Sequence, residues 1–419
     1  MKKKRILMIA FIAVLAVGLL ACTTNNPPAT SAAPSTATSA APTTSGTGTA
    51  SGQVLTLHIG MYADGADSYY QVLHDAMQAC ANDDPTCQWT IDYKVGQNTA
   101  AEQLQAVENF ITAKYDAMVV IQNSVDTTSE CIAKAKAAGI PYFGAVHSFG
   151  TAKNATDAAG SCGYDFVLEG KLAGDQAIKA GAKKVVMIEG QLGQGTAGAQ
   201  TLGYLQAYEA AGKNLGGVTA EQLATQKNSA KQDGKQDITV VGWASGGWFA
   251  DPAQKAMANF ITSLGPNGFD SVYVQNNPMM EGVLQAMKDA GLDPAKYFLS
   301  SGNGREISWQ WVKDGVIDAD VNQTAALEGD VIYQQVKGYF LKQNYRKYVH
   351  PYMTEYDASN VNSVALIPFS DVTQYMEQRN AGKFVHDITD PKFTDMPNMG
   401  TTATGSPSGT AATGSPSAS

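Results

Sequence analysis

Polar side chains follow two successive predicted strands within residues 115–149. Ala117–Ile121 is a short apolar run rich in β-branched residues, which is typical of a strand covered on both faces. Gln122 and Asn123 come directly after it, and the next predicted strand ends near His147. Ligands of a parallel α/β sheet gather at the carboxyl ends of its strands. These amide and imidazole groups therefore predict a hydrogen-bonding site at one rim of a sheet.

The segment between these two strands has the signals of a helix. Thr127 and Glu130 have the spacing of a capping box, in which a hydroxyl and a carboxylate each satisfy an amide at a helix start. Gly139 follows in the position of a helix C-terminal glycine. A strand, a helix and a second strand are therefore expected to position the rim.

A glycine-rich stretch offers a different chemistry. Gly193, Gly195 and Gly198 have the spacing of a dinucleotide-binding loop between a strand and a helix. The stretch begins several residues after its strand, however, and the next strand, Asp237–Trp243, has no terminal acidic residue for a ribose. The chain also lacks the Gly-x-Ser-x-Gly and His-Glu-x-x-His motifs. We therefore expect no enzyme and no cofactor.

The first 22 residues predict export. A basic start and an apolar run, Ile6–Leu20, lead to Cys22 in a pattern that resembles the lipobox of a bacterial lipoprotein. The resemblance implies a lipid on Cys22 that anchors the protein to the outer face of the cell membrane. An ordinary cleaved signal or an uncleaved anchor is the alternative, but the apolar run is shorter than the ~20 residues of a membrane span.

Four further cysteines follow in the exported part, and an even number suggests disulfides. Cys80 and Cys87 flank a turn-rich loop that could bring them together, which favours a Cys80–Cys87 bond. Elimination then leaves Cys131–Cys162. Free buried thiols are the alternative, and a metal site is disfavoured because no CxxC pair or histidine cluster is present.

Composition separates the chain into a folded part and two tails. Residues 23–52 and 398–419 are almost wholly Thr, Ser, Ala, Pro and Gly, so we expect a disordered tether and a disordered tail. The 419 residues leave enough chain between them for two lobes. A formal net charge of -9 and the absence of a basic stripe argue against nucleic acid as a partner.

Between the tails, strand and helix signals alternate, which predicts an α/β fold with parallel sheets. The last strand is expected at Ser363–Ile367. The polar insertion 214–236 is expected to form a surface loop or a short helix. Asn277 before Pro278 has the pattern of a helix N-cap.

The order of elements over residues 53–380 resembles the type I periplasmic binding proteins, specifically the ribose-binding-like sugar receptors of ABC transporters. The strings that carry the resemblance are Ile59-Gly60 with Asp67–Tyr70, Tyr115–Ala117, Ala138–Pro141, Asp165 with Gly170–Gly174, Gly190–Gly203, Val274–Asn277, Glu281-Gly282 with Ala286, and Asp320–Gln323.

The resemblance implies two Rossmann-like lobes joined by a three-segment hinge, with the ligand clamped between them. The first lobe would take residues 53–149 and 324–362, and the second residues 150–323 and 363–397. Such receptors are expected to act as monomers that pass a sugar to a membrane permease.

The resemblance also implies site residues. Tyr69 and Tyr70 stand where the family carries paired aromatics, and Trp248 where it often carries one from the other lobe; flat rings suit the apolar faces of a sugar. The complete set of residues expected to bind ligand is Asp67, Tyr69, Tyr70, Gln122, Asn123, His147, Gln200, Trp248, Asn277 and Gln323.

Two departures from the family pattern affect the ligand. Asn277 replaces a usual aspartate, and His147 stands near an Asp-Arg pair that this chain lacks. The site therefore has less charge than that of a pentose receptor, and a nucleoside or a furanone-type signal is an alternative ligand. The alternative function is that of a sensor, whose ligand-bound conformation is recognised by a signalling partner.

Overall fold

The structure is a computed structural model that describes residues 54–122, 124–147, 152–192, 194–227 and 232–397. The predicted signal peptide with Cys22, the tether, the tail and Asn123 lie outside the described residues. Within that part of the chain, no helix is long and apolar enough to cross a membrane.

The first lobe is built on a seven-stranded sheet of described residues, in the order β13-β11-β5-β4-β3-β1-β2. All its strand pairs are parallel except β11 with β13. The strands are β1 (Leu55–Ala63), β2 (Cys87–Val95), β3 (Ala117–Ile121), β4 (Tyr142–Ala145), β5 (Gly160–Cys162), β11 (Tyr348–His350) and β13 (Thr394–Asp395).

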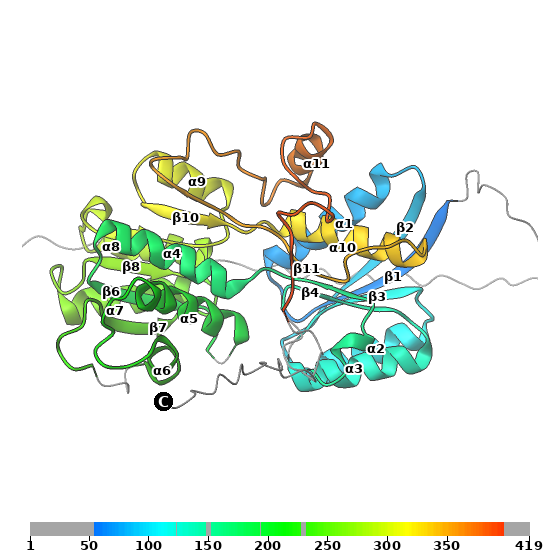
Figure 1. Cartoon of the computed structure of the whole chain (residues 1–419), viewed down its shortest axis with the longest axis horizontal. Helices are drawn as coiled ribbons and strands as arrows, with labels where there is room; N and C mark the ends of the chain where they lie inside the picture. The colour runs from blue at the N-terminus through cyan, green and yellow to red at the C-terminus, as the bar shows by residue number, and fades with distance from the viewer. Residues whose placement is uncertain (1–53, 123, 148–151, 193, 228–231, 398–419) are drawn as a thin grey trace, which may run out of the picture. The chain divides into compact units, whose positions relative to one another are not determined.

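Helices cover both faces of this sheet. Successive side chains of its central strands point to opposite faces, and those on both faces are apolar, so both faces must be buried. One face packs against α1 (Ser68–Asp83) and α10 (Ala325–Phe340), on which α11 (Val372–Asn380) lies farther from the sheet, and the other face packs against α2 (Ala100–Thr112) and α3 (Val125–Ala138) (Figure 1). A short 3-10 helix, Ala155–Asp157, precedes β5.

The second lobe is built on a six-stranded sheet of described residues, in the order β12-β10-β9-β8-β6-β7, with only β12 antiparallel to its neighbour. The strands are β6 (Lys184–Glu189), β7 (Thr239–Ser245), β8 (Ser271–Val274), β9 (Phe298–Ser300), β10 (Ala319–Asn322) and β12 (Thr354–Asp357).

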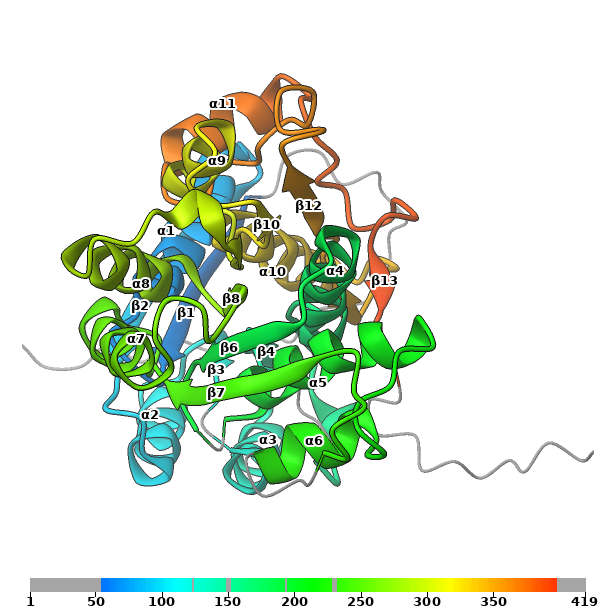
Figure 2. The same ribbon diagram turned by 90° about the vertical axis from the view of Figure 1, so that its left-hand side faces the viewer.

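Its helices again form two layers (Figure 2). One layer is α4 (Phe166–Ala180), α5 (Gly195–Ala210) and α6 (Ala220–Gln226), and the other is α7 (Ala250–Leu264), α8 (Asn277–Asp289) and α9 (Glu306–Lys313), with a 3-10 turn at Pro294–Lys296. The predicted α/β fold of two lobes with mainly parallel sheets is therefore confirmed.

The boundaries between the lobes differ from the prediction. The chain first leaves the first sheet after β5, not after residue 149, because Gly160–Cys162 pairs with β4 and β11. Residues 354–357 belong to the second sheet, whereas α11 and β13 return to the first lobe. The described chain thus passes between the lobes four times, and the predicted three-segment hinge lacked the last passage.

Several local predictions were also displaced. Ser363–Ile367 forms no strand and belongs to the last passage between the lobes. Helix α3 begins at Val125 with Ser124 as N-cap, three residues before the predicted capping box. Helix α8 is capped by Asn276, whose side chain accepts from the Met279 amide, so that Asn277 is the first helical residue.

The predicted disulfides are wrong: all four described cysteines are free thiols. Cys80 faces α11, where its sulfur lies 3.7 Å from that of Met376, whereas the Cys87 thiol contacts Asp84 at 3.6 Å. Cys131 and Cys162 belong to hydrophobic clusters on opposite faces of the first sheet. A disulfide needs Cβ atoms about 4 Å apart, and the sheet separates the second pair.

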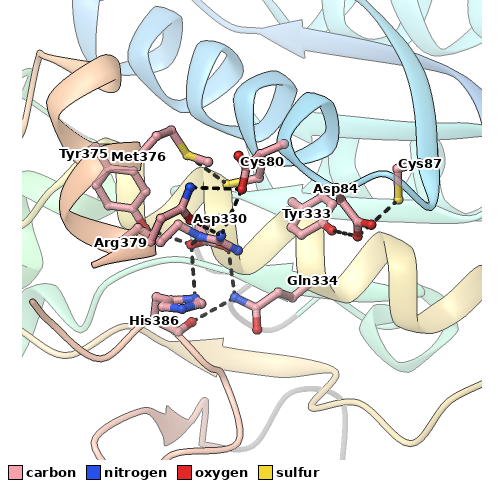
Figure 3. A network of polar contacts seen from close by, with 12 residues as sticks. Cys80, Asp84, Cys87, Asp330, Tyr333, Gln334, Tyr375, Met376, Arg379 and His386 are labelled. Carbon is pink, nitrogen blue, oxygen red and sulfur yellow. Dashed lines mark hydrogen bonds and ion pairs between the residues drawn. The ribbon is translucent and has the colours of Figure 1, made fainter. Parts of the chain in front are cut away.

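A buried ion pair fixes the C-terminal segment to the first lobe (Figure 3). Asp330 of α10 is fully buried and accepts from Arg379 Nε at 2.6 Å and from the Tyr375 hydroxyl at 3.0 Å. Gln334 also donates to Asp330, at 3.0 Å, and His386 lies 3.5 Å away. Helix α11 is held against α10 by this network, which explains why the segment belongs to the first lobe.

Candidate functional site

A cavity of about 60 Å³ lies where the carboxyl ends of the parallel strands of both sheets converge. Residues of both lobes line it: Asp67, Ser68, Tyr69, Tyr70, Val146, His147, Phe166, Gln194, Thr196, Gln200, Trp248, Gln275, Asn276, Pro278, Asn303, Arg305, Gln323 and Phe369. The cavity is therefore the candidate functional site.

Helix starts supply much of the lining. Asp67, Gln194, Asn276 and Arg305 are the N-cap residues of α1, α5, α8 and α9. Each helix follows a strand whose carboxyl end points toward the cavity, so the strand–helix connections place their polar side chains there. The helix starts also carry partial positive charge, which favours oxygen-rich groups of a ligand.

Aromatic rings form apolar walls. Tyr69 packs edge-on against Tyr70, with ring centroids 6.3 Å apart, and against Phe369, at 5.6 Å. On the second lobe, the Trp248 ring lies against Gly190, where a Cβ atom would collide with it. Trp248 Nε1 donates to Gln194 Oε1 at 2.6 Å, which fixes the orientation of the indole.

Three cavity residues have left-handed backbone conformations that L-residues rarely adopt. They are Val146, with φ 64°, Trp248, with φ 73°, and Asn303, with φ 81°. For a β-branched or bulky residue this conformation costs roughly 1–3 kcal/mol and persists only where the surroundings impose it. The strain at Val146 and Trp248 is consistent with a functional site.

Among the lining residues, one carboxylate and one guanidinium bear opposite charges. Burial raises the pKa of Asp67, and this rise is opposed by a hydrogen bond from the Tyr69 amide, at 2.8 Å, and by the charge of Arg305. The Arg305 guanidinium lies over the Phe369 ring, 5.8 Å from its centroid. The opposite charges of Asp67 and Arg305 sum to zero within the lining, and Arg305 Nη1 also lies 3.8 Å from the carboxylate of Glu281, which does not line the cavity.

His147 connects the two lobes. Its Nδ1 lies 2.9 Å from the Thr196 hydroxyl of the second lobe, and its Nε2 lies 3.4 Å from the Tyr70 hydroxyl of the first. Burial lowers the pKa of His147 to about 4, so the imidazole is neutral at pH 7. A neutral imidazole has one donor and one acceptor, which suits a bridge between two hydroxyl groups.

Two buried glutamates lie behind the lining. Burial raises the pKa of Glu169 to about 8 and that of Glu328 to about 7. Glu169 accepts from Gln200 Nε2 at 2.7 Å, and Glu328 accepts from the Tyr69 hydroxyl at 2.6 Å. These hydrogen bonds favour the ionised forms but offset the desolvation only in part.

These two pKa values predict that stability falls as pH rises above neutrality. The unfolded carboxyls ionise near pH 4.5, so between that pH and their folded pKa values the folded state binds more protons than the unfolded state. The free energy of unfolding should fall by about 3 kcal/mol from pH 6.5 to 8.5. His147 is neutral throughout this window and does not contribute to the change.

Urea unfolding at a series of pH values measures this change, and the double variant Glu169→Gln/Glu328→Gln should show a flatter profile. A free energy of unfolding that rises over this window in the unsubstituted protein would contradict the prediction.

The cavity brings together seven of the ten residues expected from the sequence. Those that line it are Asp67, Tyr69, Tyr70, His147, Gln200, Trp248 and Gln323. Gln122 and Asn277 do not line it, and Asn123 lies outside the described residues.

Gln122 and Asn277 instead support the backbone behind the cavity. Gln122 is 3% exposed and donates to the His147 carbonyl. Asn277 is fully buried, donates to Asp320 Oδ2 at 2.7 Å and accepts from the Arg305 amide at 2.8 Å. Both side chains point inward, and the neighbours of Asn277 in the chain, Asn276 and Pro278, line the cavity in its place.

Sequence reasoning missed Arg305, Phe369, Asn276 and Asn303 among others. A signal existed for Asn303 and Arg305. Asn303 is the central residue of a Gly-Asn-Gly loop at the end of β9, and Arg305 directly follows that loop. Phe369 had none, since it lies in the unpredicted fourth passage between the lobes. Groups of three or more potential metal ligands are absent from the described residues.

Comparison with known proteins agrees with the fold. The family model described as "Periplasmic binding protein domain" matches residues 59–343, more than half of the chain, and the chain belongs to this family. Members of this family are extracytoplasmic solute-binding proteins, and the protein is accordingly a binding protein rather than an enzyme, as the sequence predicted.

Two characterised relatives are similar in sequence. The xylitol-binding protein of Mycolicibacterium smegmatis is 29% identical over 196 residues, which are 46% of this chain and 48% of that protein. The galactofuranose-binding protein YtfQ of Escherichia coli is 26% identical over 246 residues, 57% of this chain and 69% of that protein. The alignment thus spans about half the length of the first relative.

Solved structures share the fold. A galactofuranose-binding protein superposes with a TM-score of 0.62 at 21% identity, covering 78% of this chain and all of that one. A solute-binding protein from Actinobacillus succinogenes with bound D-allose gives a TM-score of 0.60 at 19% identity, covering 74% of this chain and 100% of that one.

Proposed function

We propose that the protein is the solute-binding receptor of an ABC importer and that it binds a neutral polyhydroxylated solute, a sugar or a polyol, in the cavity between its lobes. The observation that carries this proposal is the lining of the cavity, in which aromatic walls from both lobes surround amide and hydroxyl groups. Flat rings suit the apolar faces of a sugar or polyol, and planar amides suit its hydroxyls.

The charges of the lining favour a ligand without net charge. Asp67 and Arg305 balance each other, and His147 is neutral at pH 7. A charged ligand would bring an unbalanced charge into a buried site, which costs several kcal/mol unless a partner compensates it. The Gln200 Oε1 atom, which is buried and has no hydrogen-bond partner among the described residues, offers an acceptor for a ligand hydroxyl.

The names of the relatives support the same chemical class, since they describe binders of xylitol and of galactofuranose. A pentitol and a furanose share a short row of adjacent hydroxyls. The permease partner, the lipid on Cys22 and the attachment to the outer face of the cell membrane remain part of this proposal, on the basis of the sequence of the first 22 residues.

A thermal-shift screen tests the ligand class. The panel contains pentitols, pentoses and hexoses in furanose and pyranose forms, with gluconate and glucosamine as charged counterparts. A neutral ligand present at 100 times its Kd should stabilise the folded protein by about 2.7 kcal/mol. The proposal fails if only a charged counterpart raises the melting temperature, or if no compound in the panel does.

A further inference from the structure

The tripeptide Leu-Glu-Gly occurs in corresponding places of the two lobes. It is Leu168–Gly170 in α4 and Leu327–Gly329 in α10. Both helices enter their lobe directly after a passage of the chain between the sheets, and in both the glutamate is the fourth helical residue. The two lobes therefore present the same local arrangement on the helix that follows the passage.

The glycine of each tripeptide permits close packing against the helix that follows the first strand of its lobe's sheet, α5 after β6 and α1 after β1. A Cβ atom on Gly170 would collide with the backbone carbonyl of Gln200 in α5, and one on Gly329 with that of Leu73 in α1. Because these contacts involve backbone atoms, a side chain could not be accommodated without moving a helix. The preceding glutamate is thereby brought next to a helix that lines the cavity.

Each glutamate then bonds to a cavity residue without lining the cavity itself. Glu169 is 1% exposed and accepts from the side-chain amide of Gln200 at 2.7 Å. Glu328 is fully buried and accepts from the Tyr69 hydroxyl and from the Val146 amide, both at 2.6 Å. Tyr164 and Cys162 are further titratable groups close to Glu328.

The bond from Val146 to Glu328 has a consequence for the next residue. It holds the Val146 amide while the residue adopts its left-handed conformation, with φ 64°. That conformation turns the chain so that His147 reaches both Tyr70 and Thr196. Glu328 thus fixes the Tyr69 ring directly, through its hydroxyl. It also fixes His147, the residue that bridges the two lobes, through the backbone of Val146.

We propose that Glu169 and Glu328 are a matched pair of positioning residues, one in each lobe, which hold opposite walls of the cavity in the arrangement that binds the solute. This inference rests on the proposed function, because it assumes that the cavity binds a solute. The positions that the two glutamates hold do not depend on which solute that is. The following experiments need no ligand, so the inference can fail or succeed separately from the sugar assignment.

NMR titration of the histidines tests the role of Glu328. The chain has five histidines, so single replacements assign the signals. In the unsubstituted protein His147 should not titrate above pH 5, whereas in Glu328→Leu its pKa should rise by about one unit or more as it gains access to water. Glu328→Gln should keep the low pKa, because an amide can accept from Val146 and donate to Tyr69.

Asp330→Asn is the matched control. Asp330 is a buried carboxylate two residues further along α10, but it faces Arg379 and Tyr375 on the other side of the helix. This variant should lose stability and leave the pKa of His147 unchanged. If Glu328→Leu does not fold, Glu328→Asp, which is too short to bond both donors, should raise the pKa in the same way.

The role of Glu169 is measured by hydrogen exchange of the Gln200 side-chain amide. Exchange should be faster in Glu169→Leu than in the unsubstituted protein and unchanged in Glu328→Leu. The inference is overturned if a folded Glu328→Leu or Glu328→Asp variant leaves His147 untitrated above pH 5, or if Glu169→Leu leaves the exchange of Gln200 unchanged.

Discussion

Replacing Arg379 with methionine should lower the free energy of unfolding by about 3–5 kcal/mol. Arg379 donates to both carboxylate oxygens of Asp330, from Nε at 2.6 Å and from Nη2 at 3.3 Å, and Asp330 is fully buried. Methionine keeps most of the apolar stem but removes the charge, so a buried carboxylate loses its counter-ion. Urea unfolding measures the loss.

Lys171→Met provides the matched control for this prediction. Lys171 pairs with Asp175 at 2.7 Å on the surface of α4, where both side chains are more than 40% exposed. Removal of such a pair should cost less than about 1 kcal/mol. A loss for Arg379→Met as small as that for Lys171→Met would show that the network of Figure 3 does not hold the C-terminal segment.

Replacing Trp248 with alanine should weaken solute binding by roughly 30-fold to 1,000-fold, which corresponds to about 2–4 kcal/mol. Its indole forms a wall of the second lobe and is fixed by Gly190 and Gln194. Phe166 of α4 is the other aromatic residue that this lobe contributes to the lining among the described residues. Tyr70→Ala should act in the same direction from the first lobe. Calorimetric titration with the ligand found in the thermal-shift screen measures both.

Trp309→Ala is the control for Trp248→Ala. Trp309 packs against the core of the second lobe and does not line the cavity. Its replacement should lower the melting temperature while the Kd of the folded protein stays within a few-fold of that of the unsubstituted chain. An unchanged Kd in both Trp248→Ala and Tyr70→Ala would refute stacking as the basis of recognition.

Much of the fold follows from the alternation of strand and helix patterns, because apolar runs such as Val185–Ile188 identify buried parallel strands without tertiary information. The strands β5, β11 and β13 have two or three residues each. Strands this short contain too few residues to show the alternation of apolar and polar side chains. The lobe to which residues 150–164 and 363–397 belong could therefore not be predicted. The missing fourth passage follows from the same lack of signal.

The candidate site could be predicted in part. Strand ends led to Asp67 and His147, because such positions follow from the sheet, whereas Gln200 was predicted from the resemblance to the sugar receptors. Gln122 and Asn277 stand at strand ends but turn their side chains away from the cavity, and sequence does not give the direction of a side chain at a strand end. Phe369 required knowledge of the path between the lobes.

The cysteines illustrate a related limit. A short loop between Cys80 and Cys87 made a disulfide plausible, but the helix that contains Cys80 turns its thiol toward Met376 of α11. The partner comes from a segment almost 300 residues away. Proximity in sequence was therefore a poor guide to the direction of the side chain.

A crystal structure of the protein with the ligand selected by the thermal-shift screen is the most direct test of the central claim. We predict that the solute lies between the two sheets, stacked against Trp248 and a tyrosine of α1, with hydrogen bonds to Gln200 and Arg305. A solute bound outside this cavity, or one whose net charge is balanced by residues other than Asp67 and Arg305, would contradict the account.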